Sequence, residues 1–392
     1  MNGALHILFV TGEYPPLQGG VGAYTEQLGL ALCEQGATVS VLTSARARTP
    51  AGEHSPAKIA VYPVFDHWGV AIWPAVKKWA DKLGVNWLHV QYQTAAFGMN
   101  PAINLAPWFW RRRTRLAWTY HDLLPPYLFP KAGHTLRTWV TERPAHLCHL
   151  PIVTNEGDFQ QLAPTAPNVQ KIPIGSNIQG AVFTPAERTA RRTARGYAEN
   201  ALVVGYFGFL NRSKGGLTLI RTLERLCQAH PDAHLLMIGE RVGASDPTNF
   251  AYLQEVEALV AERGLLARVQ WTGRQDDAEV SADLAACDVL FMPYEDGASL
   301  RRGTLMAGLA NGCAIVTTTP QAPLPELVDG RDLCYVAPGD AAAAAQAILQ
   351  IAQDAKLATG LRQQARQRSR LFTWDAIAVR HLELYESIAI SF

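Results

Sequence analysis

The sequence predicts an α/β protein built from two Rossmann-like domains, each a doubly wound parallel sheet, which face each other across a cleft. Three observations support this fold class. Short apolar segments of strand length alternate with helical patterns in both halves of the chain. The alternation stops near residues 171–178 and then starts again. The length of 392 residues also suits two or three domains of ordinary size.

The first half opens with a strand–loop–helix–strand unit. Residues 6–10 (HILFV) form an apolar run typical of a buried parallel strand, and a Gly- and Pro-rich loop follows at 13–22. A helix is expected at 23–35 and ends before Gly36, and residues 38–42 give the second strand. Similar strands are predicted at 87–91, 116–120 and 150–154.

The second half restarts the pattern after a linker at 171–178 and a polar, Arg-rich stretch that ends at Asn200. A strand at 201–207 leads through a loop at 208–216 to a helix at 217–229. A further helix begins after Asp340, a good N-cap residue, and a last one is expected at 373–390. The remaining predicted strands are 233–238, 269–271, 289–292, 314–317 and 333–336.

Composition narrows the classes of protein. A hydrophobic content of 48% with 18% charged residues excludes wholesale disorder, and a net charge of +1 gives no general attraction to nucleic acid or membranes. Residues 1–10 run directly into a strand pattern without a basic leader, and no apolar run is long enough to span a bilayer. We expect a cytoplasmic protein, with peripheral contact at the inner face of the membrane left open.

The six cysteines are too far apart in the sequence for a CxxC metal or redox motif. We therefore expect small buried side chains in a reducing compartment and no metal site. They are Cys33, Cys148, Cys227, Cys287, Cys313 and Cys334.

The loop after the first strand contains Gly19 and Gly20 directly before a helix. Backbone amides at such a helix N-terminus attract anions, so a diphosphate is one expected ligand. A dinucleotide-binding fingerprint is disfavoured because the glycine spacing is wrong and no acidic residue ends the second strand. A glycine turn without any ligand stays open as the alternative.

Two loops of the second half are candidate anion sites for the same reason. In the first loop, Arg212 and Lys214 precede a helix, which suits a diphosphate, although such a cluster is also typical of a solvated loop. The second loop, PYEDGASLRRGT at 293–304, lies between an apolar strand and an apolar helix at 305–310. Its candidate diphosphate ligands are Ser299, Arg301, Arg302, Gly303 and Thr304, and Glu295, Asp296 and Gly239 are candidates for the sugar or nucleotide.

His121 ends the strand at 116–120, on the edge of the sheet where ligands collect in such folds. It is the candidate catalytic residue of the first half, and Lys214 is its counterpart in the second. A histidine at this place is also compatible with a purely structural role.

Taken together, these segments resemble the family-4 glycosyltransferases of the GT-B fold over nearly the whole chain. GEYPPLQGGVGAYTEQLGLALCEQGATVSVLT, TYHD and KIPIGSNI carry the likeness in the first half. GFLNRSKGGLTLI, LFMPYEDGASLRRGTLMAGLANGCAIVTT and VDGRDLCYVAPGD carry it in the second. The order and spacing of so many segments make the match specific.

The resemblance implies retaining transfer of a sugar from a nucleotide diphosphate sugar, such as a UDP or GDP sugar, without a metal or other cofactor. It places the acceptor (a glycan, a lipid-linked glycan or a small-molecule glycoside) on residues 1–172, which the C-terminal helix 373–392 rejoins. The donor belongs to residues 173–372. No nucleic acid partner is implied.

Two features, at three positions, depart from the family pattern. The phosphate loop carries Phe209 where relatives have arginine, and Ser299 and Ala307 stand where relatives have two glutamates. The loop therefore resembles an S-x-R-R-G variant within the same family, in which Arg301 and Arg302 supply the missing charge. The variant predicts that one of them grips phosphate while the other holds Glu295 or Asp296.

Two other functions compete with this assignment. A nucleotide-sugar epimerase would need an acidic pair that the sequence does not show, and a catalytically degenerate partner protein would explain Phe209 and Ala307.

The segment WFWRRR at 108–113 suits either an anionic membrane or a basic helix end. We favour the helix end because one short cluster binds membranes weakly.

Overall fold

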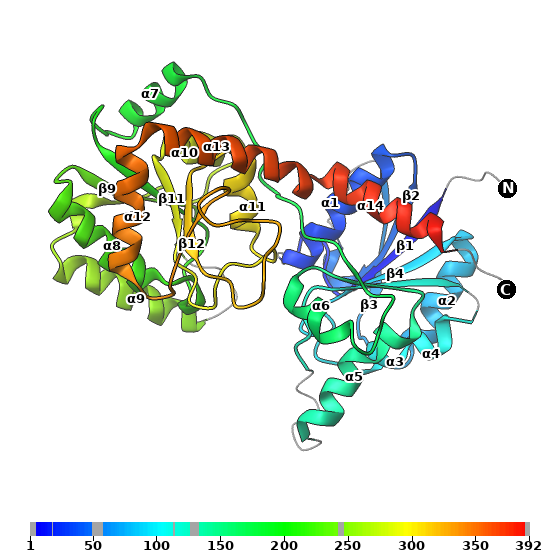
Figure 1. The fold of residues 1–392 in the computed structure, drawn as a ribbon. Coiled ribbons are helices and arrows are strands. Elements are labelled where there is room, and N and C mark those ends of the chain that lie inside the picture. Colours follow the sequence, from blue (N-terminus) through cyan, green and yellow to red (C-terminus); the bar gives the residue numbers. More distant parts are fainter. Residues whose placement is uncertain are drawn as a thin grey trace. The chain divides into compact units, whose positions relative to one another are not determined.

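The computed structural model describes residues 5–17, 19–48, 58–112, 114–125, 133–241 and 247–388. The chain divides into two compact units (Figure 1). Unit 1 comprises residues 1–175 and 373–392, and unit 2 comprises residues 176–372.

The described part of unit 1 contains a sheet of seven strands in the order β3-β2-β1-β4-β5-β6-β7, and every neighbouring pair is parallel. The order reverses at β1, which confirms the doubly wound topology predicted from the sequence. The strands are β1 (His6–Thr11), β2 (Thr38–Ser44), β3 (Ile59–Phe65), β4 (Trp87–Tyr92), β5 (Arg115–Tyr120), β6 (Leu150–Val153) and β7 (Gln170–Lys171).

Helices cover both faces of this sheet. Along β1, Ile7 and Phe9 belong to the core that includes α1 and α14, whereas Leu8 and Val10 belong to the core that includes α2 and α4. Both sets are fully buried, as expected for a parallel strand between two helical layers. The helices of unit 1 are α1 (Gly20–Glu34), α2 (Ile72–Leu83), α3 (Ala102–Leu105), α4 (Pro107–Trp110), α5 (Gly133–Leu147), α6 (Glu156–Leu162) and α14 (Trp374–Ser387).

In the described part of unit 2, the sheet has six strands in the order β10-β9-β8-β11-β12-β13, again with every pair parallel. The strand order reverses at β8, so unit 2 repeats the topology of unit 1 without repeating its sequence. The strands are β8 (Leu202–Phe207), β9 (Ala233–Ile238), β10 (Val269–Trp271), β11 (Val289–Met292), β12 (Ile315–Thr318) and β13 (Cys334–Val336).

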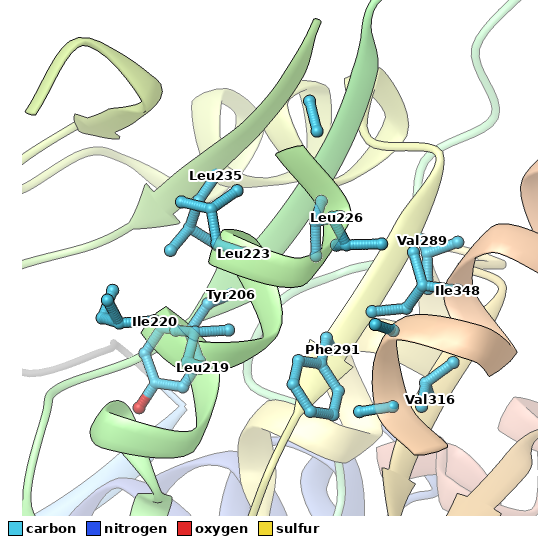
Figure 2. Close-up of a cluster of buried hydrophobic side chains, with 14 of the residues drawn as sticks. Tyr206, Leu219, Ile220, Leu223, Leu226, Leu235, Val289, Phe291, Val316 and Ile348 are labelled. Atoms are coloured by element: carbon cyan, nitrogen blue, oxygen red, sulfur yellow. The ribbon is translucent and has the colours of Figure 1, made fainter. Parts of the chain in front are cut away.

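The main core of unit 2 lies where α8 and α12 pack on the central strands. Figure 2 shows Leu223 of α8 and Ile348 of α12 among the side chains around Phe291 of β11. All three are buried. The helices of unit 2 are α7 (Pro185–Ala194), α8 (Gly216–Ala229), α9 (Pro247–Glu262), α10 (Asp277–Ala286), α11 (Gly303–Ala310), α12 (Ala341–Gln353) and α13 (Ala355–Ser369).

Several boundaries differ from the sequence predictions. Helix α1 begins at Gly20, three residues earlier than expected, because the glycines form its first turn rather than the end of a loop. The Arg-rich stretch before Asn200 contains helix α7. A capping box formed by Thr184 and Glu187 stabilises the start of this helix. Gly36 follows α1 with a φ of +90°, so the predicted helix stop is confirmed.

The C-terminal helix α14 packs against α1 in unit 1, which confirms the predicted return to the first domain. The side chain of Thr373 caps its N-terminus by accepting a hydrogen bond from the amide of Ala376, 3.2 Å away. Of the predicted span, residues 389 and 390 lie outside the described residues. In Figure 1 the helix is red beside the blue α1.

Within the described ranges, no helix combines the length and apolar character needed to cross a bilayer. All six cysteines are free, and three of them (Cys148, Cys287 and Cys313) are buried. A search of the same residues finds no group of three or more His, Cys, Asp or Glu side chains arranged to hold a metal ion.

Candidate functional site

In unit 2, the candidate residues gather where β8 and β11 end. These strands are adjacent and parallel, so the loops that follow them leave the same edge of the sheet. The loops also bond to each other, because the amide of Glu295 donates to the carbonyl oxygen of Ser213 at 2.8 Å. Topology alone therefore brings Lys214 close to the 293–304 loop.

Two glycines allow the close approach of these loops. Gly215 has a φ of +70°, and a Cβ there would lie 1.8 Å from the carbonyl oxygen of Pro293. Gly208 has a φ of +110°, and a Cβ there would lie 2.8 Å from Cγ2 of Thr304 and 3.1 Å from Nζ of Lys214. Only glycine fits both positions, so the ammonium group of Lys214 lies directly against the backbone that follows β8.

Lys214 is largely withdrawn from solvent. Burial and, as the smaller cause, the positive charge of Arg302 lower the pKa of its ammonium group to about 8. No carboxylate among the described residues pairs with it. A half-buried cation next to a second cation is unfavourable in the free protein, and an anionic ligand would relieve it.

Arg302 is held in place from two sides. Its guanidinium pairs with both carboxylate oxygens of Asp296 and lies over the ring of Tyr294, 4.6 Å from the ring centre. Its side chain is only 19% exposed. Arg302 thus makes the carboxylate contact that the sequence predicted for one of the two arginines, whereas phosphate binding by the other arginine stays a prediction.

Helix α11 starts directly after Arg302, with Gly303 and Thr304 as its first residues. No side chain caps its N-terminus. The Thr304 hydroxyl instead shares a 2.7 Å hydrogen bond with the Tyr294 hydroxyl. The positive end of this helix is therefore available near two fixed cations.

The other candidates of unit 2 make their described contacts with residues other than Lys214. Arg212 is exposed, pairs with Glu255 of α9 at 3.0 Å and lies over the ring of Tyr252. The hydroxyl of Ser299 accepts a hydrogen bond from the amide of Arg301 at 3.3 Å. Arg301 and Glu295 are exposed, and Gly239, with a φ of +103°, donates its amide to the hydroxyl of Thr272 at 2.9 Å.

In unit 1, His121 follows β5 and is only partly exposed. Its Nε2 lies 2.9 Å from Oε1 of Gln91, and the ring of Tyr24 meets its ring edge-on with centres 4.6 Å apart. Burial lowers the pKa of the imidazole to about 3, so His121 is neutral at physiological pH. It can orient a sugar hydroxyl as a neutral group.

A side-chain carboxylate of the protein already occupies the N-terminus of α1. Oε1 of Glu13 accepts hydrogen bonds from the amides of Val21 (3.0 Å) and Gly22 (3.3 Å). A Cβ at Gly19 would lie 2.1 Å from this carboxylate oxygen, whereas Gly20 has open space around it. The close contact with Glu13 accounts for Gly19 without any ligand, and diphosphate binding by Gly19 and Gly20 remains a prediction.

Sequence reasoning missed three residues of these regions. Glu13 caps α1, Tyr294 supports Arg302, and Gln91 contacts His121. Only Gln91 had a usable signal, because it lies near the C-terminal end of β4 next to the strand that ends at His121. The roles of Glu13 and Tyr294 depend on side-chain contacts that spacing does not reveal.

Two protein families match the chain, one over each of the two units. A profile described as Glycosyltransferase Family 4 matches residues 18–170, and one described as Glycosyl transferases group 1 matches residues 201–354. Together they cover more than half of the chain. The chain belongs to the group 1, family 4 glycosyltransferases.

Individual relatives of this family 4 chain are distant. D-inositol 3-phosphate glycosyltransferase of Corynebacterium jeikeium is 26% identical over 249 residues, which are 61% of this chain and 57% of the relative. Phosphatidyl-myo-inositol mannosyltransferase of Mycobacterium leprae is 23% identical over 222 residues, 56% of this chain and 54% of the relative. The chain thus spans about half the length of the curated relatives that it matches.

The solved structure of Anabaena HepE in complex with UDP and glucose superposes with a TM-score of 0.72. The superposition covers 98% of this chain and 100% of HepE at 19% identity. It confirms that this family 4 protein has the GT-B fold.

Proposed function

We propose that this protein transfers a sugar from a nucleotide diphosphate sugar to an acceptor hydroxyl, with retention of configuration and without a metal. The observation that carries the proposal is Lys214, a largely buried ammonium group without a described carboxylate partner and with Arg302 as its neighbour. Such an arrangement fits the diphosphate of the donor better than it fits a structural role. Retention comes from the family resemblance.

In the proposed donor complex, Lys214 and Arg302 bind the two phosphates, and the N-terminus of α11 at Gly303 and Thr304 adds backbone donors. This arrangement uses the S-x-R-R-G variant in place of the missing arginine at Phe209. It departs from the sequence prediction of divided roles, because it gives both the Asp296 contact and phosphate binding to Arg302, the arginine whose charge acts on Lys214. Glu295 and Gly239, also at this sheet edge, are proposed to contact the sugar or the ribose. HepE was solved with UDP, so a uridine nucleotide is the first donor to test.

The chemistry follows from these charges. When the bond between the anomeric carbon and the phosphate oxygen breaks, the electron pair stays on the leaving nucleotide diphosphate. Lys214 and Arg302 stabilise the charge that develops there. The acceptor hydroxyl attacks the anomeric carbon from the same face and gives its proton to a leaving phosphate oxygen. His121 of unit 1, which is neutral, is proposed to orient a sugar hydroxyl.

For the acceptor, the two distant relatives suggest an inositol-type polyol, free or lipid-linked, bound by unit 1. A lipid-linked acceptor would require contact with a membrane. Unit 1 has an exposed aromatic surface suited to this: Trp108 and Phe109 of α4 with Leu136 and Trp139 of α5, each more than 40% exposed. We call these four residues the aromatic surface.

Arginine side chains lie beside the aromatic surface. The guanidinium of Arg143 lies 5.0 Å from the ring centre of Trp108 and 5.5 Å from that of Trp139. Arg111 and Arg112 are exposed next to it, whereas Arg113 lies outside the described residues. Indole rings suit the interface of a bilayer, and arginines suit anionic headgroups. Leu136 and Trp139 of α5 enlarge the short cluster that the sequence alone showed. We therefore propose peripheral binding to an anionic membrane through this surface, in place of the helix-end interpretation.

Vesicle flotation tests the membrane proposal. The protein should float with vesicles that contain anionic lipid and not with neutral ones, and the double variant Trp108→Ser/Trp139→Ser should remain at the bottom. Phe250→Ser is the matched control, because Phe250 is an exposed aromatic residue of α9 in unit 2. Equal flotation of all three proteins would remove the proposal.

Nucleotide titration tests the donor proposal. UDP, GDP and ADP are compared with UMP, which lacks the second phosphate, and the free energy of unfolding is followed. A diphosphate at a hundred times its Kd adds about 2.7 kcal/mol to that free energy. Lack of stabilisation by any diphosphate would instead favour the catalytically degenerate partner. Conversion of a nucleotide sugar to its epimer without an acceptor would favour an epimerase.

A further inference from the structure

A series of hydrogen-bonded polar side chains, which we call the polar network, leads from His121 to the C-terminal helix within unit 1. His89 and Gln91 are adjacent in their face of β4, because side chains two residues apart on a strand share one face. Oε1 of Gln91 lies 2.9 Å from Nε2 of His121, and Nε2 of Gln91 lies 3.4 Å from Nε2 of His89. Nδ1 of His89 in turn contacts the hydroxyl of Tyr385 on α14 at 2.5 Å.

The polar network is dry. His89, Gln91 and Tyr385 are completely buried, and so is Thr119, whose hydroxyl lies 2.8 Å from Nε2 of His89. Burial lowers the pKa of His89 well below its usual value, and the neighbouring His381 and His121 add to this effect. Every imidazole of the polar network is therefore neutral, and each carries one hydrogen on one of its two nitrogens.

Neutrality makes the hydrogen-bond directions interdependent. With the amide nitrogen of Gln91 on the side of His89, Nε2 of His89 is an acceptor, chiefly from the hydroxyl of Thr119 at 2.8 Å and more weakly from Gln91 at 3.4 Å. The hydrogen of His89 is then on Nδ1 and is donated to the oxygen of Tyr385. At the other end, the carbonyl oxygen of Gln91 accepts from His121, which places the hydrogen of His121 on Nε2.

This assignment leaves Nδ1 of His121 as a free acceptor. Among the residues that the structure describes, none bonds to this nitrogen, although Nε2 is engaged. An acceptor at this position can take a hydrogen bond from a sugar hydroxyl. If the amide of Gln91 were turned by 180°, Nδ1 would carry the hydrogen and could only donate.

We propose that Gln91 is a positioning residue that sets the tautomer of His121, and that His89 and Tyr385 fix Gln91 in turn, so that α14 supports the site. The inference rests on the proposed function, since it assigns His121 to a sugar hydroxyl. It also explains why a glutamine, rather than an apolar residue, occupies a fully buried position on β4. A buried amide requires partners, and here both of its ends have one.

The tautomer is measured directly by long-range 1H–15N NMR of the imidazoles, with His121 assigned through His121→Gln. We expect the hydrogen on Nε2 in the wild-type protein without any substrate. In Gln91→Leu the signal should shift toward the mixture of tautomers that a free imidazole shows. Hydrogen on Nδ1 in the wild-type protein, or an unchanged spectrum in Gln91→Leu, would overturn the proposal.

Kinetics provide the second measurement. Gln91→Leu should lower kcat at least tenfold and leave the Kd for the nucleotide diphosphate unchanged, because that ligand belongs to unit 2. Gln91→Glu keeps an acceptor for Nε2 of His121 and adds a charge that raises the pKa of the imidazole. Its kcat should therefore approach the wild-type value at high pH and fall as the pH is lowered.

A merely structural role predicts a different outcome, namely that both variants lose activity and thermal stability together at every pH. That result would contradict the proposal. Failure of the proposed function is recognised separately: the wild-type protein would then bind no nucleotide diphosphate, while the tautomer of His121 would still be measurable. Tyr385→Phe, which removes only the last link, should shift the His121 signal less than Gln91→Leu does.

Discussion

Both units place their candidate residues in loops that follow parallel strands of a doubly wound sheet, yet the chemistry differs between the two units. At the edge of the unit 1 sheet, His121 is neutral and hydrogen-bonded to Gln91 in a dry network. At the edge of the unit 2 sheet, Lys214 and Arg302 bring two cations together, and only Arg302 has a described carboxylate partner.

The helix N-termini differ in the same way. In unit 1, the carboxylate of Glu13 occupies the start of α1. In unit 2, no side chain caps α11. The comparison indicates that the parallel sheet sets where candidate residues gather, whereas the side chains at its edge set which ligand would suit them. A neutral acceptor suits a sugar hydroxyl, and a cation without a described carboxylate partner, such as Lys214, suits a diphosphate.

The largest expected effect is that of Lys214→Met. We expect the Kd for the nucleotide diphosphate to rise about 10–100-fold and the turnover of the true donor to fall roughly 10²–10³-fold, because a charged donor to the phosphates is lost. Stability should change in the opposite direction. Removing a lysine whose pKa is lowered to about 8 should raise the free energy of unfolding of the free protein, by up to about 3 kcal/mol.

Calorimetric titration and denaturant unfolding measure both effects. The matched control is Lys356→Met, because Lys356 is an exposed lysine of α13. Tight diphosphate binding by Lys214→Met, or a loss of stability of the free protein, would show that the cation has a structural role. The contrast between the two units would then disappear.

Arg302→Lys should have the next largest effect. Lysine cannot form the two parallel hydrogen bonds of a guanidinium, so we expect the Kd for the diphosphate to rise about tenfold or more. Arg301→Lys is the paired control and should change the Kd less, since Arg301 is exposed. The reverse order of the two variants would assign phosphate binding to Arg301 and leave Arg302 with the loop alone.

The pH dependence of binding should distinguish the units more finely. Lys214 must be protonated to bind a diphosphate, and its pKa in the free protein is about 8. Above pH 8 the affinity should therefore fall, approaching tenfold per pH unit, whereas His121, with a pKa of about 3, adds no dependence between pH 5 and 9. Calorimetry at pH 7, 8, 8.5 and 9 measures the slope, which should vanish in Lys214→Met.

The same group has a consequence for folding. Its pKa is lower in the folded than in the unfolded state, so between about pH 8 and its unfolded value the unfolded state binds more protons. The contribution of Lys214 to the free energy of unfolding thus rises with pH over this range. A contribution that falls with pH would mean that Lys214 has an unrecognised anionic partner.

The smallest expected effect concerns Glu13. Glu13→Gln removes the anion from the N-terminus of α1 and should lower the free energy of unfolding by about 1 kcal/mol. Chemical denaturation measures this, with Glu34→Gln near the other end of α1 as the control. If Glu13→Gln instead bound nucleotide diphosphates more tightly, the N-terminus of α1 would be a ligand site after all, as the glycine pattern first suggested.

The sequence by itself determined the fold class, most of the strands and the importance of particular strand ends. These features are local. An apolar run such as residues 6–10 is long enough to be recognised, and Gly36 and Asp340 mark helix ends through their own backbone or side chain. The topology rule then places Lys214 and the 293–304 loop at one edge without any knowledge of contacts.

Only the tertiary structure decided which side chains at those edges act together. Arg212 and Lys214 lie two residues apart in one loop and were both candidate phosphate ligands, but Arg212 pairs with Glu255 of α9, whereas Lys214 has no described carboxylate partner and is affected by the charge of Arg302. Gln91 contacts His121 directly and is linked through His89 to Tyr385, which is nearly three hundred residues away. Burial, pKa and hydrogen-bond direction depend on all elements packed around a group, and a sequence pattern records only those on its own element.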